Sequence, residues 1–124
     1  MDKKLKLAFV DDNVLHLKVI EHLAREMGNY EMLYSCHNGK ELVHFLDKSI
    51  DHPDVCILDL HMPEMDGMET ARLLRRRYPM IRLFGYSASE SADEKKRFLD
   101  SGVKLVFSKQ SPRKMLTSIY HYTM

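Results

Sequence analysis

Five short runs of apolar residues alternate with five stretches of helical periodicity, and this alternation constrains the fold more than any other feature of the chain. We predict strands at residues 5–10, 30–36, 55–59, 81–86 and 103–107, with a helix after each. Regular strand–helix alternation is typical of a parallel sheet with right-handed crossovers and helices on both faces. We therefore predict an α/β fold of the flavodoxin-like kind, with a five-stranded parallel sheet in the order 2-1-3-4-5.

The ends of the predicted helices carry residues that suit those positions. Asn13 can cap the first helix, because its side-chain oxygen can accept a backbone N–H that has no partner within the helix. Gly28 can end that helix in a left-handed conformation. The last helix is expected to begin with Ser111 as its cap and Pro112 in its first turn. The apolar stripe of the first helix is predicted to comprise Val19, Ile20, Leu23 and Met27.

The third apolar run ends on a carboxylate. Residues 55–58 are Val, Cys, Ile and Leu, as expected of a strand covered on both faces, and Asp59 follows them directly. Pro63 and Gly67 favour a turn, and a helical pattern starts at Met68. Open α/β sheets bind their ligands at the carboxyl ends of strands, where Asp59 is predicted to lie. A single aspartate there would usually only cap a turn, so its role depends on the neighbouring strand ends.

Polar residues also follow three other predicted strands. Asp11 and Asp12 follow the first strand, Ser87 the fourth and Lys109 the fifth. In a parallel sheet these ends share one edge, so we expect the carboxylates of Asp11, Asp12 and Asp59 to lie close together and repel each other. A cation relieves that repulsion, and oxygen ligands with open positions suit Mg²⁺. The seven histidines show no zinc-binding spacing, which disfavours zinc.

This combination of groups suits phosphoryl transfer. A carboxylate can attack phosphorus and form an aspartyl-phosphate. The metal ion and the Lys109 ammonium would neutralise the charge on the equatorial oxygens during transfer. Each group alone is a weak signal, because an Asp-Asp pair or a lysine often follows a strand. Four such groups at one edge of a sheet form a specific signal.

The composition indicates a soluble protein of one domain. The chain has 124 residues, of which 44% are hydrophobic and 30% are charged, and we predict one domain over residues 1–124. A net charge of +1 gives no strong field to attract nucleic acid or an anionic membrane. Cys36 and Cys56 lie in or beside apolar runs, and we expect small core residues in a reducing compartment rather than a disulfide.

The sequence also bears on the cellular location. No apolar stretch approaches the roughly 18 residues of a membrane-spanning helix, so we expect no membrane contact. Residues 1–4 are Met-Asp-Lys-Lys and lead directly into the first predicted strand, so we expect no signal peptide. The cytoplasm is the expected location.

Over nearly its whole length the chain resembles the receiver domain of two-component response regulators. The matching segments are residues 10–12 (Val-Asp-Asp), 38–41 (Asn-Gly-Lys-Glu), 59–67 (Asp-Leu-His-Met-Pro-Glu-Met-Asp-Gly), 87–88 (Ser-Ala) and Lys109. The resemblance implies a receiver-type fold and assigns roles to the strand-end residues. Asp59 would be the phosphoacceptor, Asp12 would bind Mg²⁺ together with Asp59 and the backbone carbonyl of His61, and Asp11 would hold the metal through water. Lys109 would pair with the phosphoryl group, and Ser87 would donate a hydrogen bond to it.

The same resemblance implies partners and a biological role. A sensor histidine kinase would supply the phosphoryl group, and the domain would be a signalling phosphoacceptor rather than an enzyme. Phosphorylation would switch a surface on the fourth helix, fifth strand and fifth helix, which could support a homodimer. Residues 109–112 and 77–79 are similar to the subfamily with a C-terminal helix-turn-helix domain, which controls transcription. Any DNA contact would come only through such an output domain, so the chain is either a stand-alone receiver or a part of a longer regulator.

Two positions depart from the family pattern. Gln110 stands where many receivers have proline, and Val106 stands where many have an aromatic residue. Phe107 is one residue late and is expected to point to the opposite face of the sheet. We therefore expect the signal to leave the site by movement of the fourth helix and the loop before it, and not by the flip of an aromatic ring.

Three other interpretations compete with a phosphorylated receiver. A haloacid-dehalogenase-type phosphatase would need a second aspartate two residues after Asp59, where this chain has His61. A flavin-binding protein of this fold would need a phosphate-binding loop after the first strand, where two aspartates would repel phosphate. A receiver-like interaction module that is never phosphorylated is the more serious alternative. The presence of every acceptor-site residue type favours phosphorylation over it.

Overall fold

The computed structural model describes residues 3–124 and contains a single parallel sheet flanked by five helices. The strands are β1 (Leu5–Val10), β2 (Tyr30–Cys36), β3 (Val55–Asp59), β4 (Arg82–Ser87) and β5 (Val106–Ser108). The helices are α1 (Val14–Met27), α2 (Gly39–Lys48), α3 (Gly67–Arg77), α4 (Ala92–Asp100) and α5 (Pro112–Thr123). The strand order is β2-β1-β3-β4-β5, with every neighbouring pair parallel, which confirms the predicted fold class. Residues 1–2, which the predicted domain included, lie outside the described part of the chain.

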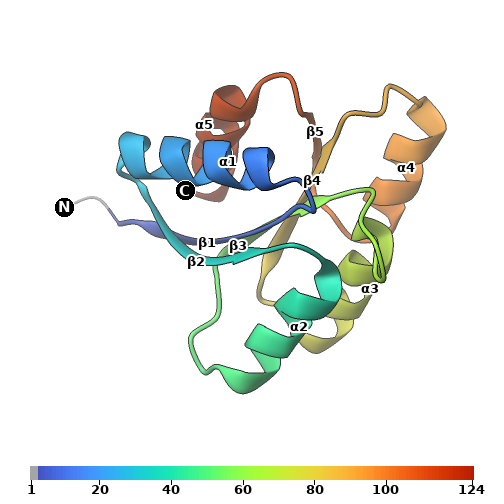
Figure 1. Ribbon diagram of the computed structural model, residues 1–124, viewed down its shortest axis with the longest axis horizontal. Helices are drawn as coiled ribbons and strands as arrows, with labels where there is room; N and C mark the ends of the chain where they lie inside the picture. The colour runs from blue at the N-terminus through green and yellow to red at the C-terminus, as the bar shows by residue number, and fades with distance from the viewer. Residues whose placement is uncertain (1–2) are drawn as a thin grey trace.

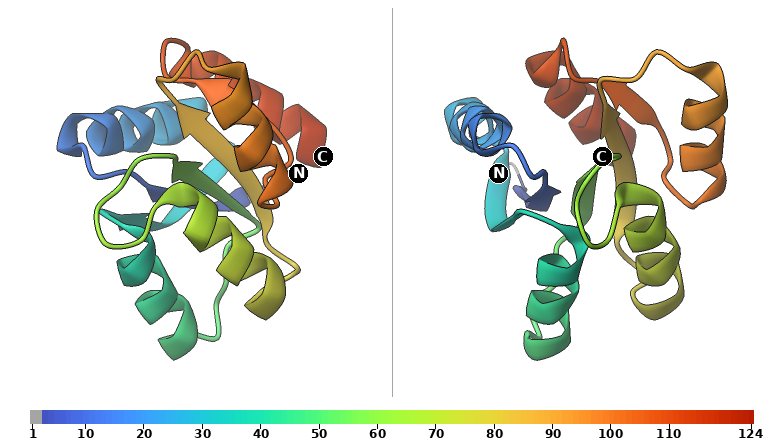
Figure 2. Two further views of the ribbon diagram at one scale, coloured as in Figure 1. Left: turned by 90° about the vertical axis from the view of Figure 1, so that its right-hand side faces the viewer. Right: turned by 45° about the vertical axis from the view of Figure 1, so that its right-hand side comes forward.

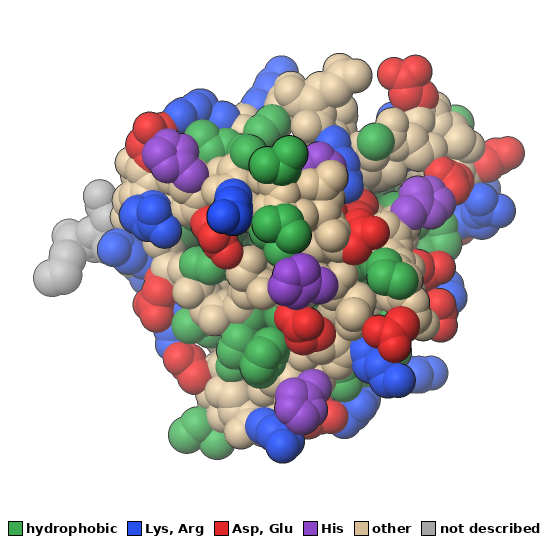
Figure 3. All heavy atoms as spheres, viewed as in Figure 1, with side chains coloured by type: hydrophobic (Ala, Val, Ile, Leu, Met, Phe, Trp, Pro, Cys, Tyr) green, Lys and Arg blue, Asp and Glu red, His purple; other side chains and the backbone are tan. Residues whose placement is uncertain are grey.

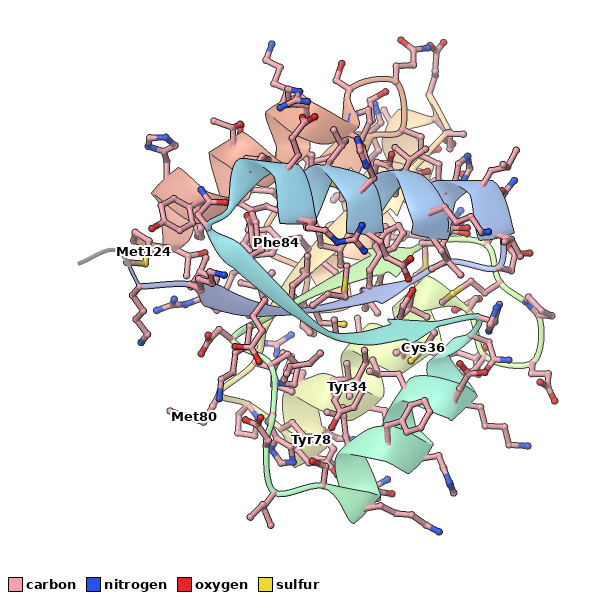
Figure 4. All side chains as sticks on the ribbon, turned by 60° about the vertical axis from the view of Figure 1, so that its left-hand side comes forward. Tyr34, Cys36, Tyr78, Met80, Phe84 and Met124 are labelled. Atoms are coloured by element: carbon pink, nitrogen blue, oxygen red, sulfur yellow. The ribbon has the colours of Figure 1, made fainter. Side chains whose placement is uncertain are left out.

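The helices cover the two faces of the sheet unequally. Helices α1 and α5 pack on one face, and α2 and α3 pack on the other (Figure 1). Helix α4 lies beside α3, near the β5 edge (Figure 2). Each face has its own buried hydrophobic cluster. Tyr34 and Cys36 of β2 belong to the cluster under α2 and α3, whereas Phe84 of β4 belongs to the one under α1 and α5 (Figure 4).

The central strand β3 is buried on both faces. All five of its residues are buried, which explains why its sequence is an apolar run and does not alternate with polar residues. Its neighbours β1 and β4 pair with it in parallel along its length. Both cysteines are buried free thiols, as predicted. Burial raises the pKa of Cys36 to about 12, so this side chain acts as a small apolar residue at neutral pH.

The predicted helix ends are confirmed at α1 but only in part at α5. The Asn13 side chain accepts hydrogen bonds from the backbone N–H groups of Leu15 and His16, at 2.9 and 3.3 Å. Gly28 ends α1 with a φ of 77°. Pro112 begins α5, but the side chain of Ser111 makes no capping hydrogen bond. Ser111 therefore occupies the predicted cap position, and its backbone carbonyl accepts from the N–H of Met115 at 3.0 Å, but its side-chain oxygen does not cap the helix.

The predicted apolar stripe of α1 is confirmed at Ile20 and in part at Leu23 and Met27, but not at Val19. The buried residues are Leu17, Ile20 and Ala24, whereas Val19 is 45% exposed. Successive residues of an α-helix point about 100° apart, so a stripe centred on Ile20 cannot also bury Val19. The prediction for Val19 was wrong for this reason. The predicted residues Leu23 and Met27 pack partly buried against the core.

The last strand is shorter and later than predicted. Residues 103–107 were expected, but β5 covers only Val106–Ser108. Gly102 has a φ of 125°, so the chain leaves α4 through a turn. The backbone N–H of Lys104 donates to the carbonyl of Leu83 before the regular ladder begins. β4 likewise covers Arg82–Ser87 instead of residues 81–86, so Ser87 is itself the last residue of its strand.

The side chain of Phe98 lies over the strand β4 at the residue that pairs with Val106. Val106 pairs with Gly85 of β4, and Phe98 of α4 is fully buried over this glycine. A Cβ atom added at Gly85 would lie 2.6 Å from the Phe98 ring, so the ring rests directly on the strand. Phe107 packs in the cluster under α1 and α5, on the face opposite to Val106, as predicted. On this side of the sheet the aromatic ring therefore comes from α4 and not from β5.

The surface is of mixed charge. Acidic and basic side chains are interspersed over the face shown in Figure 3, in keeping with the net charge of +1. Within residues 3–124 no helix has both the length and the apolar character needed to cross a membrane.

Candidate functional site

The carboxyl ends of β1 and β3 bring three aspartates together. Asp11 follows β1 directly, Asp12 comes next, and Asp59 is the last residue of β3. One carboxylate oxygen from each of them lies within 4.8 Å of the other two. Asp11 and Asp59 are buried, whereas Asp12 is exposed. The predicted acidic cluster is thus formed, with one of its three members open to solvent.

Lys109 joins the two buried carboxylates. Its Nζ atom lies 2.8 Å from Oδ1 of Asp59 and 3.0 Å from Oδ2 of Asp11. Its backbone N–H donates to the carbonyl of Ser87 at 3.1 Å, which fixes the loop after β5 against the end of β4. The ammonium also lies 5.5 Å from the centre of the Tyr86 ring, within the range of a cation–π interaction.

Burial and the neighbouring charges shift the pKa values of these groups. Burial raises the pKa of Asp59 to about 7, and the Asp11 carboxylate adds to this rise, although hydrogen bonding to Lys109 opposes it. Burial by itself would lower the pKa of Lys109, but its hydrogen bonds to Asp59 and Asp11 outweigh that effect and raise it. Lys109 is therefore a firmly charged ammonium beside a carboxyl group that is unusually basic.

Ser87 lies at the end of the strand next to β3 and is 2% exposed. Asp59 pairs with Tyr86 across the two strands, so Ser87 is one position beyond it in register. The Ser87 hydroxyl accepts a hydrogen bond from the backbone N–H of Ser89 at 3.0 Å. Accepting this bond leaves the hydroxyl hydrogen able to donate to an anion.

The side chain of His61 reaches α4. Its Nε2 atom lies 3.2 Å from Oε2 of Glu94, and the imidazole is 71% exposed. A hydrogen bond with Ser89 is the largest of several effects that lower the pKa of Glu94, and the contact with His61 adds to them. The loop after β3 is thereby linked across the rim of the site to the first turns of α4. No sequence pattern pointed to Glu94, because the link depends on where α4 begins in space.

Two further residues of the site escaped sequence reasoning. His16 lies in the first turn of α1, and its Nδ1 atom is 3.1 Å from Oδ2 of Asp11. Tyr86 lies in β4 under the Lys109 ammonium and packs edge-on against Phe9 and His16. The apolar pattern of this strand predicts Tyr86 only as a core residue. The single useful signal for His16 is its place one turn after the Asn13 cap, which keeps it near the end of β1.

The donor set at this sheet edge fits a hard divalent cation. Carboxylate oxygens are the preferred ligands of Mg²⁺, and this ion commonly takes only one or two of them and fills its other positions with water and phosphate. Asp12 and Asp59 can supply two such oxygens from adjacent strand ends. The described residues of this cluster include no thiolate, so the chemistry of the donors matches the predicted metal better than it matches zinc.

Comparison with known proteins matches this chain to one domain family and to longer proteins of several kinds. Residues 7–121 match the family model of the response regulator receiver domain. The transcriptional regulatory protein FlgR of Helicobacter pylori is 34% identical over 117 residues, which are 94% of this chain and 29% of that protein. A protein-glutamate methylesterase/protein-glutamine glutaminase of Pyrococcus horikoshii is 29% identical over 82% of this chain and 27% of its own length. The chain thus spans less than a third of either relative.

A solved structure supports the same conclusion about the fold. The signal receiver domain of NarL from Mycobacterium tuberculosis superposes with a TM-score of 0.88 at 21% sequence identity, covering 98% of this chain and 97% of that one. The strand-end aspartates, the lysine after β5 and the match over residues 7–121 agree with one another, and the chain belongs to the family of response regulator receiver domains.

Proposed function

We propose that this domain accepts a phosphoryl group on Asp59 in a Mg²⁺-dependent reaction and thereby switches a signalling surface. The observation that carries the proposal is the position of the Lys109 ammonium, 2.8 Å from Oδ1 of Asp59 within the cluster of three aspartates. A sensor histidine kinase is the proposed donor. The proposed role is phosphorelay signalling and not catalysis on a separate substrate.

The positions of the aspartates suggest how they divide the binding of the metal. Asp12 is exposed and free to bind the ion directly, together with Asp59 and the backbone carbonyl of His61. Asp11 already accepts bonds from Asn13, His16 and Lys109, so it suits an indirect role through water. When bound, Mg²⁺ would neutralise negative charge on the phosphoryl oxygens.

The transfer itself can be written for the residues of this chain. A carboxylate oxygen of Asp59 attacks phosphorus, an oxygen–phosphorus bond forms, and the bond from phosphorus to the donor nitrogen of phosphohistidine breaks. The electron pair of that bond leaves with the imidazole, which takes a proton. Lys109 is placed to donate to a phosphoryl oxygen, and Ser87 can donate its hydroxyl hydrogen to another.

Acetyl phosphate, a small phosphodonor, tests the proposal without knowledge of the kinase. The intact mass of the protein should increase by one phosphoryl group after incubation with acetyl phosphate and Mg²⁺. Addition of excess EDTA should prevent the increase, because the metal neutralises charge that would otherwise oppose transfer. An unchanged mass with Mg²⁺ present would contradict the proposal and favour an interaction module that is never phosphorylated.

The proposed metal ligands predict a selective loss of Mg²⁺ stabilisation. Mg²⁺ at 100 times its dissociation constant should stabilise the fold by about 2.7 kcal/mol, because it binds only the native state. Asp12→Ala should abolish most of this gain in a thermal melt. The exposed Asp100→Ala serves as the matched control and should keep it. Equal Mg²⁺ shifts in Asp12→Ala and the unmodified protein would exclude Asp12 as a direct ligand.

We further propose how the signal leaves the site. A phosphoryl group on Asp59 would attract the Ser87 hydroxyl and pull the loop that leads into α4. Helix α4 is already tied to the site by the His61–Glu94 contact and is anchored on β4 by Phe98. Motion of α4 would then change the surface formed by α4, β5 and α5, which could support a homodimer.

The proposed wider role is control of transcription in the cytoplasm. FlgR is named as a transcriptional regulatory protein, and this chain matches 29% of its length. A helix-turn-helix output domain outside this chain would make the contact with DNA, because the proposed role of the receiver is only to switch a surface.

A further inference from the structure

The imidazole of His16 lies where the acidic cluster meets the lysine. Its Nδ1 atom is 3.1 Å from Oδ2 of Asp11 and 3.4 Å from Nζ of Lys109. Its ring packs edge-on against Tyr86, with 6.4 Å between the ring centres. The backbone N–H of His16 is held by the Asn13 side chain, which fixes the start of α1. His16 therefore contacts one carboxylate of the acidic cluster and the Lys109 ammonium, while its side chain is 37% exposed.

The bonds around Asp11 decide which nitrogen of His16 carries a hydrogen. Oδ1 of Asp11 accepts from the backbone N–H of Asn13 at 2.9 Å. Oδ2 accepts from Nζ of Lys109 at 3.0 Å, and Nδ1 of His16 faces the same oxygen. A carboxylate only accepts hydrogen bonds and an ammonium only donates them. A bare Nδ1 would accept from Lys109 at 3.4 Å but would face Asp11 as a second acceptor at only 3.1 Å. The shorter contact therefore assigns a hydrogen to Nδ1, and its approach to Lys109 is then a contact between two donors.

We propose that His16 is a positioning residue that holds the Asp11 carboxylate in place and frees Lys109 for the phosphoryl group, an inference that rests on the proposed phosphorylation of Asp59. Two donors share one oxygen of Asp11, so the His16 N–H weakens the hydrogen bond between that oxygen and the Lys109 ammonium. The same N–H keeps Asp11 hydrogen-bonded when Lys109 turns toward a phosphoryl oxygen. Without His16, release of Lys109 would leave Oδ2 of a fully buried carboxylate without this donor.

Two substitutions separate the hydrogen bond from the packing. His16→Leu keeps an apolar side chain against Tyr86 but has no donor. His16→Asn loses the ring but places an amide N–H close to the position of Nδ1. His22→Leu is the matched control, because His22 lies on the same helix and is 68% exposed, outside the acidic cluster.

The rate of phosphorylation by acetyl phosphate at saturating Mg²⁺ is the first readout. His16→Leu should slow it about tenfold, the factor that corresponds to one hydrogen bond to a charged group. His16→Asn should restore the rate to within about threefold of the unmodified protein, since it keeps that bond. His22→Leu should leave the rate unchanged. The proposal would be overturned if His16→Leu were phosphorylated as fast as the unmodified protein. It would also be overturned if His16→Leu and His16→Asn slowed the reaction equally.

The second readout does not depend on phosphorylation. Nitrogen NMR of the imidazole should show a hydrogen on Nδ1 of His16, and this hydrogen should persist in a Lys109→Met variant. A bare Nδ1 in the unmodified protein would overturn the assignment even if Asp59 is phosphorylated normally. If Nδ1 carries a hydrogen but acetyl phosphate does not modify the protein, the hydrogen bond from His16 to Asp11 is supported and the proposed phosphorylation of Asp59 is wrong.

Discussion

Gly67→Ala is expected to destabilise the folded protein by about 3 kcal/mol, the upper part of the usual range for overpacking a buried position. A Cβ atom at this position would overlap with the carbonyl oxygen of Asp59 and would lie 3.0 Å from both Leu60 and the Phe98 ring. The Asp59 oxygen belongs to a buried central strand, and the Gly67 N–H is bonded to the Leu60 carbonyl at 2.9 Å. Neither backbone segment can move aside without breaking the site.

Urea unfolding of Gly67→Ala and of a matched glycine variant measures this effect. Gly28→Ala is the control, because a Cβ atom there meets nothing within 4 Å. It should cost only the strain of a left-handed alanine, about 1 kcal/mol. If both variants lose the same stability, the close approach of α3 to the end of β3 does not constrain the fold as described.

The second large effect is expected from Lys109→Met, which should slow phosphorylation by acetyl phosphate by about 100-fold or more. The substitution removes the ammonium that bridges Asp59 and Asp11 and would donate to the phosphoryl group. The buried carboxyl of Asp59, whose pKa is already raised to about 7, would then be harder still to ionise, and only the ionised form attacks phosphorus.

A control separates this effect from a general loss of positive charge. Lys104 is an exposed lysine that precedes β5, and Lys104→Met should react at the rate of the unmodified protein. Thermal melts of both variants show whether they remain folded. If the folded Lys109→Met variant is phosphorylated at the normal rate, Lys109 takes no part in the proposed reaction.

Much of the site could be predicted because a parallel sheet aligns the ends of its strands. Asp11, Asp12, Asp59 and Lys109 each follow an apolar run, so locating the strands was enough to place these residues at one edge. Errors of one residue at the carboxyl ends of β4 and β5 did not matter, because the chain beyond each strand stays at the same edge. The spatial convergence of these residues in the structure confirms that part of the argument.

The remaining features depend on packing that sequence periodicity does not contain. The contact of His16 with Asp11 depends on the direction in which α1 leaves its cap, and the His61–Glu94 contact depends on where α4 crosses the sheet. Phe98 could be predicted as a core residue of a helix, but not as the ring that rests on Gly85 beside Val106. Each of these contacts joins elements whose relative position is set by the volume of other side chains.

Mapping of the modified residue shows whether Asp59 is the phosphoacceptor. After reaction with acetyl phosphate and Mg²⁺, borohydride reduces an aspartyl-phosphate to homoserine, which peptide mass spectrometry can locate. Homoserine is expected at position 59 alone, and Asp59→Asn should gain no phosphoryl group. Homoserine at another aspartate, or a phosphoryl group retained on Asp59→Asn, would contradict the assignment of Asp59 as the phosphoacceptor.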